Sequence, residues 1–134
     1  MLKKTITYTD FNNQERKEDF YFNLSDAELM EMELSEKGGY AEMIERLIAE
    51  QDQPNIVKIF KELILKSYGK KSPDGRSFDK DERYTREFVG TNAYSKLFME
   101  LATNTDAAIA FVNGVMPANL VEQAKQQGKL PMAN

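Results

Sequence analysis

The sequence predicts an α+β protein in which an N-terminal antiparallel β-hairpin packs on a mainly α-helical domain of about five to six helices. Apolar residues alternate over positions 2–24, and from 26 to 116 they recur at helical spacing between capping and helix-ending residues. Strands followed by a run of helices are typical of the α+β class. A chain of 134 residues, 41% of them hydrophobic, suffices for one domain. We expect that domain to span 1–117, with a weakly helical or frayed tail at 118–134.

Alternation defines the hairpin and limits its loop. Ile6 and Tyr8 must share a face with Phe20 and Phe22 if both strands are to bury their apolar side chains. A two-residue turn at 12–13 would set Ile6 opposite a charged residue, whereas a loop with an odd number of residues, such as 12–14, sets Ile6 opposite Phe20. We therefore predict a three- or five-residue loop, or a bulge, with Asn12 or Asn13 in the left-handed conformation.

The first helix is predicted from its capping box, "SDAE" at 25–28, in which the hydroxyl and the carboxylate satisfy free amide donors. We expect Leu29, Met30 and Leu34 to form its apolar stripe, and Gly38-Gly39 to end it. The second helix should run from about Tyr40 to Glu50. Its expected buried side chains are Met43, Ile44, Leu47 and Ile48.

The third helix, from Asn55 to Tyr68, has the clearest amphipathic pattern and should end at Gly69. Its first turn follows Asp52, a plausible cap, and tolerates Pro54. The apolar residues expected to face the core are Ile56, Ile59, Phe60, Leu63 and Ile64.

The polar stretch "KSPDGRSFDKDER" at 71–83 is a candidate metal-binding or phosphate-binding loop. A calcium loop with Asp74-Gly75 at its fifth and sixth positions would place Lys70 and Ser72 where carboxylates or amides belong, so that interpretation fails. Ser-Pro-Asp-Gly instead matches a type I turn. Phe78 should then leave the turn on an extended segment and reach the core.

Three further helices complete the expected domain. The first is a weaker helix over about Lys80 to Val89. Thr91 caps the next, whose apolar side carries Tyr94, Leu97, Phe98 and Leu101. The last helix opens at Thr105-Asp106, runs through Ala107, Ala108, Ile109, Phe111 and Val112, and should break at Gly114 and Pro117.

Composition removes most catalytic chemistries. The chain has no histidine and no cysteine, which excludes the commonest general base, the usual zinc ligands and thiolate chemistry. Acidic pairs are frequent but stand beside basic residues on solvated faces, so a carboxylate-dependent hydrolase is disfavoured. No phosphate-binding glycine pattern occurs. We therefore predict that the protein is not an enzyme and holds no cofactor or metal.

Charge and hydropathy also limit the partners. A net charge of −4 argues against a nucleic-acid binder, whose footprint is a basic face. No apolar run is long enough to cross a bilayer, and Met1 leads directly into a strand-like segment rather than a signal peptide. These features predict a cytoplasmic protein that acts without nucleic acid or membrane.

A resemblance sharpens this picture. The ordered segments "ITYTDFNNQERKEDFYFNLSDAEL", "IVKIFKELILKSYGKKSPDGRSF" and "AYSKLFMELATNTDAAIAFVNGVMP" resemble the tail assembly chaperones of long-tailed bacteriophages over roughly Lys3 to Pro117. The resemblance implies a non-enzymatic protein that binds the tape measure protein and helps recruit tail tube subunits. It also implies a role in the host cytoplasm and absence from the mature virion.

Such families often make a longer product by a programmed frameshift. Gly128-Lys129 would suit a slippery run near the end of the shorter frame, so a longer form of the same chain is a further expected partner. The alternative function is a structural virion protein, a tail or connector subunit that assembles with itself. The oligomeric state stays open.

The expected contact residues are apolar side chains that fall off the main stripes. Methionine repacks around varied partners, and Met32 and Met99 lie off their helices' stripes, whereas Met30, Met43 and Met116 are expected to fill the core. The residues predicted to bind a partner are Met32, Tyr40, Pro73, Phe78, Tyr94 and Met99, with the loop 73–78 as a secondary surface. Tyr94 is also a candidate core residue.

Overall fold

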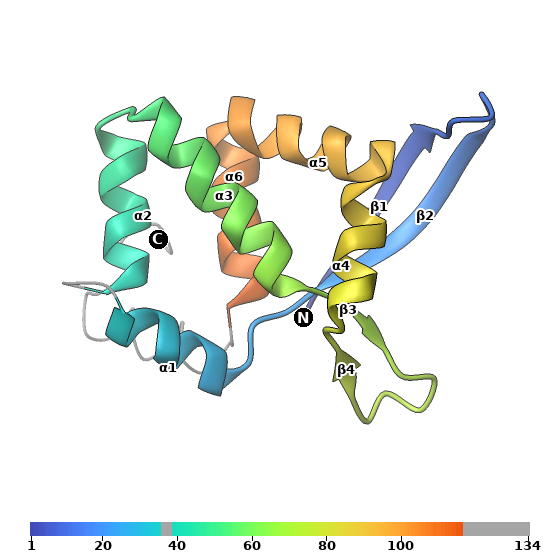
Figure 1. Cartoon of the computed structure of the whole chain (residues 1–134). Helices are drawn as coiled ribbons and strands as arrows, with labels where there is room; N and C mark the ends of the chain where they lie inside the picture. The colour runs from blue at the N-terminus through green and yellow to red at the C-terminus, as the bar shows by residue number, and fades with distance from the viewer. Residues whose placement is uncertain (36–38, 117–134) are drawn as a thin grey trace.

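The computed structural model describes residues 1–35 and 39–116, and the α+β class is confirmed (Figure 1). The strands are β1 (Leu2–Thr9), β2 (Glu15–Phe22), β3 (Tyr68–Lys71) and β4 (Phe78–Asp79). The helices are α1 (Asp26–Ser35), α2 (Tyr40–Ala49), α3 (Gln53–Ser67), α4 (Glu82–Val89), α5 (Asn92–Thr103) and α6 (Thr105–Val115). The expected tail at 118–134 and the breaks at Gly38 and Pro117 lie outside the described residues.

The β1–β2 hairpin has the predicted parity, and its pairing is that of the longer of the two predicted loops. Ile6 lies opposite Glu18, and Phe20 lies opposite Lys4. This pairing is shifted by two residues from the pairing that a 12–14 loop would give. The apolar residues still share the inner face, because a step of two preserves the face of every side chain. The loop between the strands has five residues, 10–14, and Asn13 is left-handed with φ 61°, as predicted.

Asp10 explains where the hairpin turns. Its Oδ1 accepts hydrogen bonds from the amides of Asn12, at 2.8 Å, and Gln14, at 2.9 Å. The Asp10 amide in turn donates to the Gln14 carbonyl at 2.9 Å. An aspartate that collects nearby amides in this way stabilises a turn, so the loop closes on Asp10 and Gln14.

Two short strands that the helical pattern did not predict extend the sheet to the antiparallel order β1-β2-β3-β4. The third helix ends at Ser67, and the chain continues straight into β3. Gly69 is thus a strand residue rather than a helix-ending turn. A Cβ at this position would lie 2.7 Å from Cε2 of Phe78 and 2.8 Å from the Asp79 carbonyl oxygen, so only glycine lets β3 and β4 approach this closely.

The predicted turn forms the tip of this second hairpin. The Gly75 amide donates to the Ser72 carbonyl at 2.9 Å, and Gly75 has φ 74°. Phe78 leaves on an extended segment, as predicted. Its ring is half-buried and covers Gly69, whereas we had expected it to reach the core.

The hydrophobic core lies between the inner face of the β1–β2 hairpin and the helices. Phe22 is fully buried, and its ring contacts the rings of Phe88 at 5.9 Å and Phe111 at 5.3 Å between centroids. The Leu24 amide donates to the Val115 carbonyl at 3.0 Å, which fastens the end of β2 to the end of α6. Long-range contacts therefore hold together the two ends of the described domain.

Gly114 does not break the last helix, contrary to the prediction. It lies inside α6, which continues to Val115. A Cβ on Gly114 would lie 2.9 Å from Cδ1 of Leu2, so the missing side chain makes room for the first residue of β1. The glycine serves the packing of strand on helix and is not a stop signal.

The first helix begins as predicted but faces the core differently. The Ser25 amide donates to Oε1 of Glu28 at 3.0 Å, and the Glu28 amide donates to the Ser25 hydroxyl at 3.1 Å. Leu29 is buried as expected. Met30 and Leu34, however, are 64% and 82% exposed, so the predicted stripe is wrong beyond Leu29. Position 32, three residues after Leu29, supplies the second buried side chain instead.

The remaining helices agree closely with the sequence pattern. Those predicted over 40–50 and 55–68 bury the expected side chains, with Ile48 and Ile59 partly buried. The hydroxyl of Thr91 accepts the Tyr94 amide at 3.3 Å and caps α5, as predicted. The cap of α4 is Asp81, so this helix begins two residues after its expected start.

A candidate protein-binding groove

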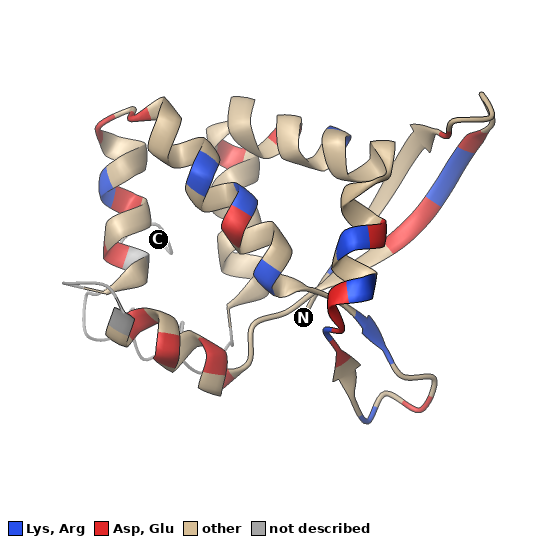
Figure 2. Cartoon of the chain, viewed as in Figure 1, with Lys and Arg blue, Asp and Glu red and all other residues tan. Residues whose placement is uncertain are grey.

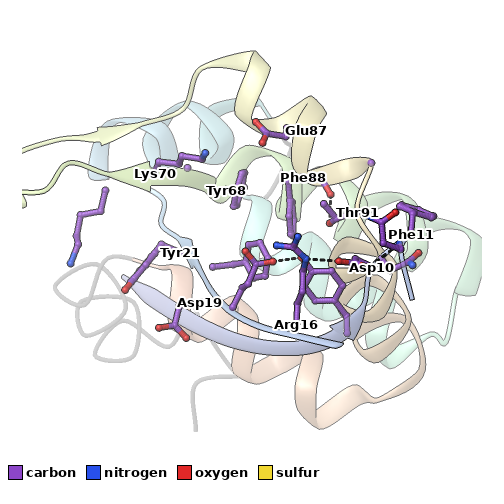
Figure 3. A pocket seen from close by; sticks show the side chains of 18 residues that line it. Asp10, Phe11, Arg16, Asp19, Tyr21, Tyr68, Lys70, Glu87, Phe88 and Thr91 are labelled. Atoms are coloured by element: carbon purple, nitrogen blue, oxygen red, sulfur yellow. Dashed lines mark hydrogen bonds and ion pairs between the residues drawn. The ribbon is translucent and has the colours of Figure 1, made fainter. Parts of the chain in front are cut away.

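A groove of about 650 Å³ runs along the β1–β2 hairpin, between β2 and the surface made by β3 and α4 (Figure 3). We call it the edge groove. Its lining residues are 10–12 at the hairpin tip, 18–21 of β2 with Tyr8 and Arg16, 68–71 of β3, and 87–88 and 90–92 around the α4–α5 junction. Its volume lies within the range usual for ligand-binding clefts.

Aromatic rings form the floor of the edge groove. Tyr68 and Phe88 stack with centroids 4.3 Å apart and ring planes at 16°. Phe20 adds its ring at 5.0 Å from Phe88, and Tyr8 follows at 6.5 Å from Phe20. Phe88 is 2% exposed and Tyr68 6%, so the rings are fixed by packing while Phe20 stays half-buried. The floor is therefore rigid and apolar before any partner binds.

One wall is a strand edge without a strand partner. β2 pairs with β1 along all eight of its residues, from Glu15 to Phe22. On its other side it pairs with β3 only at Tyr21 and Phe22. Beyond Gly69 the pairing with β2 ends, while β3 continues to Lys71 and pairs with β4 on its other side. Within the described part of the chain, the edge of β2 from Glu15 to Phe20 is left open.

The basic residues of the groove are largely engaged. Nε of Arg16 lies 2.7 Å from Oδ2 of Asp10, and this hydrogen bond, with those from the loop amides, holds the Asp10 pKa below its usual value. Nζ of Lys70 lies 4.5 Å from the centre of the Tyr84 ring, and Nζ of Lys71 lies 5.3 Å from that of Tyr21. Cations over aromatic faces are held by the ring quadrupole.

Two glutamates are among the residues that line the groove. The pKa of Tyr68 is raised first by burial and then by the charges of Glu87, from α4, and Glu18, from β2. Glu18 also accepts a hydrogen bond from the Tyr8 hydroxyl. Burial and this bond raise the pKa of Tyr8 to about 12, so Tyr8 stays neutral near pH 7. The site thus combines an apolar floor with a pair of carboxylates.

Two groove carboxylates are engaged by neighbouring groups. Asp10 is held by Arg16 and the loop amides, which lower its pKa, and Asp19 accepts a hydrogen bond from the Thr5 hydroxyl at 2.6 Å. Across residues 1–35 and 39–116, no three acidic side chains gather in a way that would hold a metal ion. In the same part of the chain, no helix has the length and hydropathy that crossing a membrane requires.

The six residues predicted to bind a partner do not gather in one place. Met32 and Tyr40 are 5% and 3% exposed, so their expected exposure is wrong, because both side chains fill the core beneath α1 and α2. Tyr94 is half-buried and meets the Phe88 ring edge-on at 5.6 Å. Pro73 and Met99 are exposed, Met99 by 54%. None of the six lines the edge groove.

The residues that do line the groove were not among those predicted from the sequence. Phe11 is the clearest case, since it is 77% exposed at the hairpin tip. Its signal is an aromatic residue between Asp10 and Asn12 that belongs to neither strand's alternation. Glu18 and Glu87 carried no signal, because single glutamates in a strand or helix are ordinary solvated residues.

Fold and site together describe a small α+β protein with a rigid aromatic floor beside an open strand edge, a shape that suits a polypeptide segment. The comparison with known families then gives the identification. The family model described as phage tail assembly chaperone matches residues 1–133, and the chain belongs to that family. No curated protein and no solved structure matches the chain.

Proposed function

We propose that this protein is a non-enzymatic tail assembly chaperone that binds the tape measure protein and helps recruit tail tube subunits during tail morphogenesis. The observation that carries the proposal is the family match over residues 1–133. The protein would act in the host cytoplasm and leave before the virion is complete.

The physical need for such a chaperone follows from its client. A long protein with exposed apolar stripes aggregates until the tail tube covers it, so another protein must shield those stripes in the meantime. The edge groove supports this role, since it offers an apolar floor and an unpaired strand edge to an unfolded or extended client. Met30 and Leu34, exposed on α1, supply a second apolar patch.

Co-expression tests the proposal. The tape measure protein of the same phage is produced in bacteria alone, with this chaperone, or with an unrelated acidic protein of similar size. We expect the tape measure protein to be soluble only with the chaperone and to be retained with it on an affinity tag carried by the chaperone. Equal insolubility in all three cultures would contradict the proposed function. Abundant chaperone in purified virions would favour a structural tail or connector subunit instead.

A further inference from the structure

We propose that the edge groove binds its client by strand addition: an extended client segment pairs with the open edge of β2 through the backbone of Lys17 and Asp19. This inference rests on the proposed function and specifies how the chaperone holds its client. It has three grounds, which are the direction of the backbone groups, the divergence of β3, and the chemistry of the groove.

The backbone groups of β2 alternate between its two edges. In an antiparallel pair, every second residue exchanges hydrogen bonds with the facing strand. The Asp10 amide donates to the Gln14 carbonyl at 2.9 Å. The backbone N–H and C=O groups of Gln14, and of every second residue after it, therefore point toward β1. Lys17 and Asp19 have the opposite parity, and their N–H and C=O groups point to the open edge.

The other side of β2 confirms this parity. The Asn23 amide donates to the Ser67 carbonyl at 2.8 Å, and Tyr21 lies opposite Gly69. The backbone N–H and C=O groups of Asn23 and Tyr21 therefore point away from β1. Asp19 and Lys17 continue the same series. In the part of the chain that the structure describes, no hydrogen bond to the backbone N–H or C=O of either residue is found.

The position that an added strand would take is left open by β3. Continuing the β2–β3 register would set Asp19 opposite Lys71, but the pairing of these two strands stops at Tyr21 and Gly69. The two strands therefore separate after Gly69, and the edge groove opens between them (Figure 3). Within the open edge, the outward backbone groups belong to Glu15, Lys17 and Asp19. This stretch is about 17 Å long at 3.4 Å per residue, which is the length of an ordinary short strand.

The groove also limits the client's side chains. On an added strand, every second side chain faces the floor formed by Phe20, Tyr68 and Phe88, so these positions should be apolar. Glu18 and Glu87 line the same groove as Tyr68. A lysine or arginine on the same face of the client would meet these carboxylates. The preferred client segment is therefore extended, with alternate apolar residues and a basic residue among them.

A second copy of this chain fits the edge poorly. Antiparallel pairing of two β2 edges centred on Lys17 would set Lys17 against Lys17 and Glu15 against Asp19. Pairing centred on Glu18 would bring two Glu18 carboxylates together. Like charges directly opposed across strands are destabilising. A client with a basic residue avoids both conflicts.

Amide hydrogen exchange tests the pairing directly. Isotope-labelled chaperone is measured alone and in its complex with co-expressed tape measure protein. We expect the amides of Lys17 and Asp19 to exchange rapidly in the free protein and about tenfold or more slowly in the complex. The amides of Arg16 and Glu18, which already face β1, serve as internal controls and should change little.

A proline pair provides a second measurement. Lys17→Pro removes an outward N–H and obstructs the added strand, and we expect client affinity to fall about tenfold, since one or two backbone hydrogen bonds are lost. Lys3→Pro is the matched control on the outer edge of β1. Lys3 pairs with Tyr21 and has the same outward parity, so it should carry the same folding cost without the loss of binding.

The outcomes separate the two proposals. A complex in which Lys17 and Asp19 still exchange rapidly, or in which both proline variants bind alike, overturns strand addition and leaves the chaperone function standing. Slow exchange already present in the isolated protein also overturns it, because the edge is then occupied by the chain itself or by a second copy. Failure to form any complex removes the proposed function and this inference with it.

Discussion

The ammonium of Lys80 donates to both carboxylate oxygens of Glu28, each at 2.7 Å, and to the backbone carbonyl of Asn23 at 2.6 Å. Glu28 belongs to the capping box of α1, and Lys80 lies between β4 and α4. One lysine thus joins the start of the first helix, the end of β2 and the second hairpin. Figure 2 shows why a cation is favoured there: the charged residues of α1 are acidic along its length.

We expect Lys80→Met to lower the free energy of unfolding by about 1–2 kcal/mol, because hydrogen bonds to charged groups are worth about that much and the Asn23 carbonyl loses its donor. The side chains are 22% and 37% exposed, which keeps the effect below that of a fully buried pair. Urea denaturation measures it. Lys66→Met is the control, since the Lys66–Glu62 pair is a surface pair within one helix and should contribute about 0.5 kcal/mol or less. Equal effects would contradict the joining role of Lys80.

The same contact predicts a pH dependence. Burial raises the pKa of Glu28, but hydrogen bonds from Lys80 and Ser25 outweigh it, and the net shift is downward from the ordinary value of 4.5. A carboxyl whose pKa is lowered by folding stabilises the protein above its unfolded pKa, and this stabilisation is lost as the pH falls through the folded pKa. The Glu28→Gln variant should therefore lose less stability than the wild type between about pH 5 and pH 3. Parallel stability curves for the two proteins over this range would contradict the prediction.

Gly69 and Gly90 form a matched pair for the β3–β4 contact. Gly69→Ala places a methyl group 2.7 Å from the Phe78 ring and 2.8 Å from the Asp79 carbonyl, so we expect a loss of about 2 kcal/mol or more in stability. At Gly90 the nearest atom to an added Cβ is 3.5 Å away and φ is −76°, so Gly90→Ala should be neutral or stabilising by about 0.5 kcal/mol. Thermal unfolding compares the two variants. If Gly69→Ala left the stability unchanged, the prediction would be wrong, because β3 and β4 would then have moved apart to accommodate the methyl group.

Local signals predicted the elements of this fold well, and tertiary contacts decided the rest. The capping box at Ser25 and the cap at Thr91 are properties of four adjacent residues, and both form as predicted. Gly69 and Gly114 carry the same local signal as a helix-ending glycine. Their actual roles depend on contacts with Phe78 and Leu2. The local sequence around each glycine does not reveal these contacts. The strands β3 and β4 were missed for the same reason.

The candidate site was harder to predict than the fold. Met32 was wrongly expected at the surface because it falls off the predicted apolar stripe of α1. In a helix this short, which residues are buried depends on how the helix packs against the rest of the domain. The edge groove exists only because β3 leaves β2 after Gly69. No short stretch of the sequence indicates where β3 separates from β2. The residues that line the groove could therefore not be grouped from the sequence.

Charge at the groove gives a binding prediction. Glu87→Lys places a cation in the lining of the groove that Glu18 shares, where we expect a basic client residue. The affinity for tape measure protein should fall by about tenfold at low salt and by less at high salt, because exposed charges are screened. Glu50→Lys, an exposed reversal at the end of α2, is the control for net charge. If both reversals weaken binding equally, a general charge effect explains the result and the carboxylate pair has no specific role.

Phe11 and Met99 distinguish the edge groove from the surface that the sequence suggested. Both are exposed, by 77% and 54%, so Phe11→Ser and Met99→Ser should each change stability by less than about 0.5 kcal/mol. Binding should differ, because Phe11 lies at the mouth of the groove and Met99 lies on α5 outside it. We expect Phe11→Ser to weaken retention of the tape measure protein several-fold, as loss of an aromatic contact at an interface does, and Met99→Ser to leave it unchanged. The reverse pattern would move the client to α5 and restore Met99 as the contact residue.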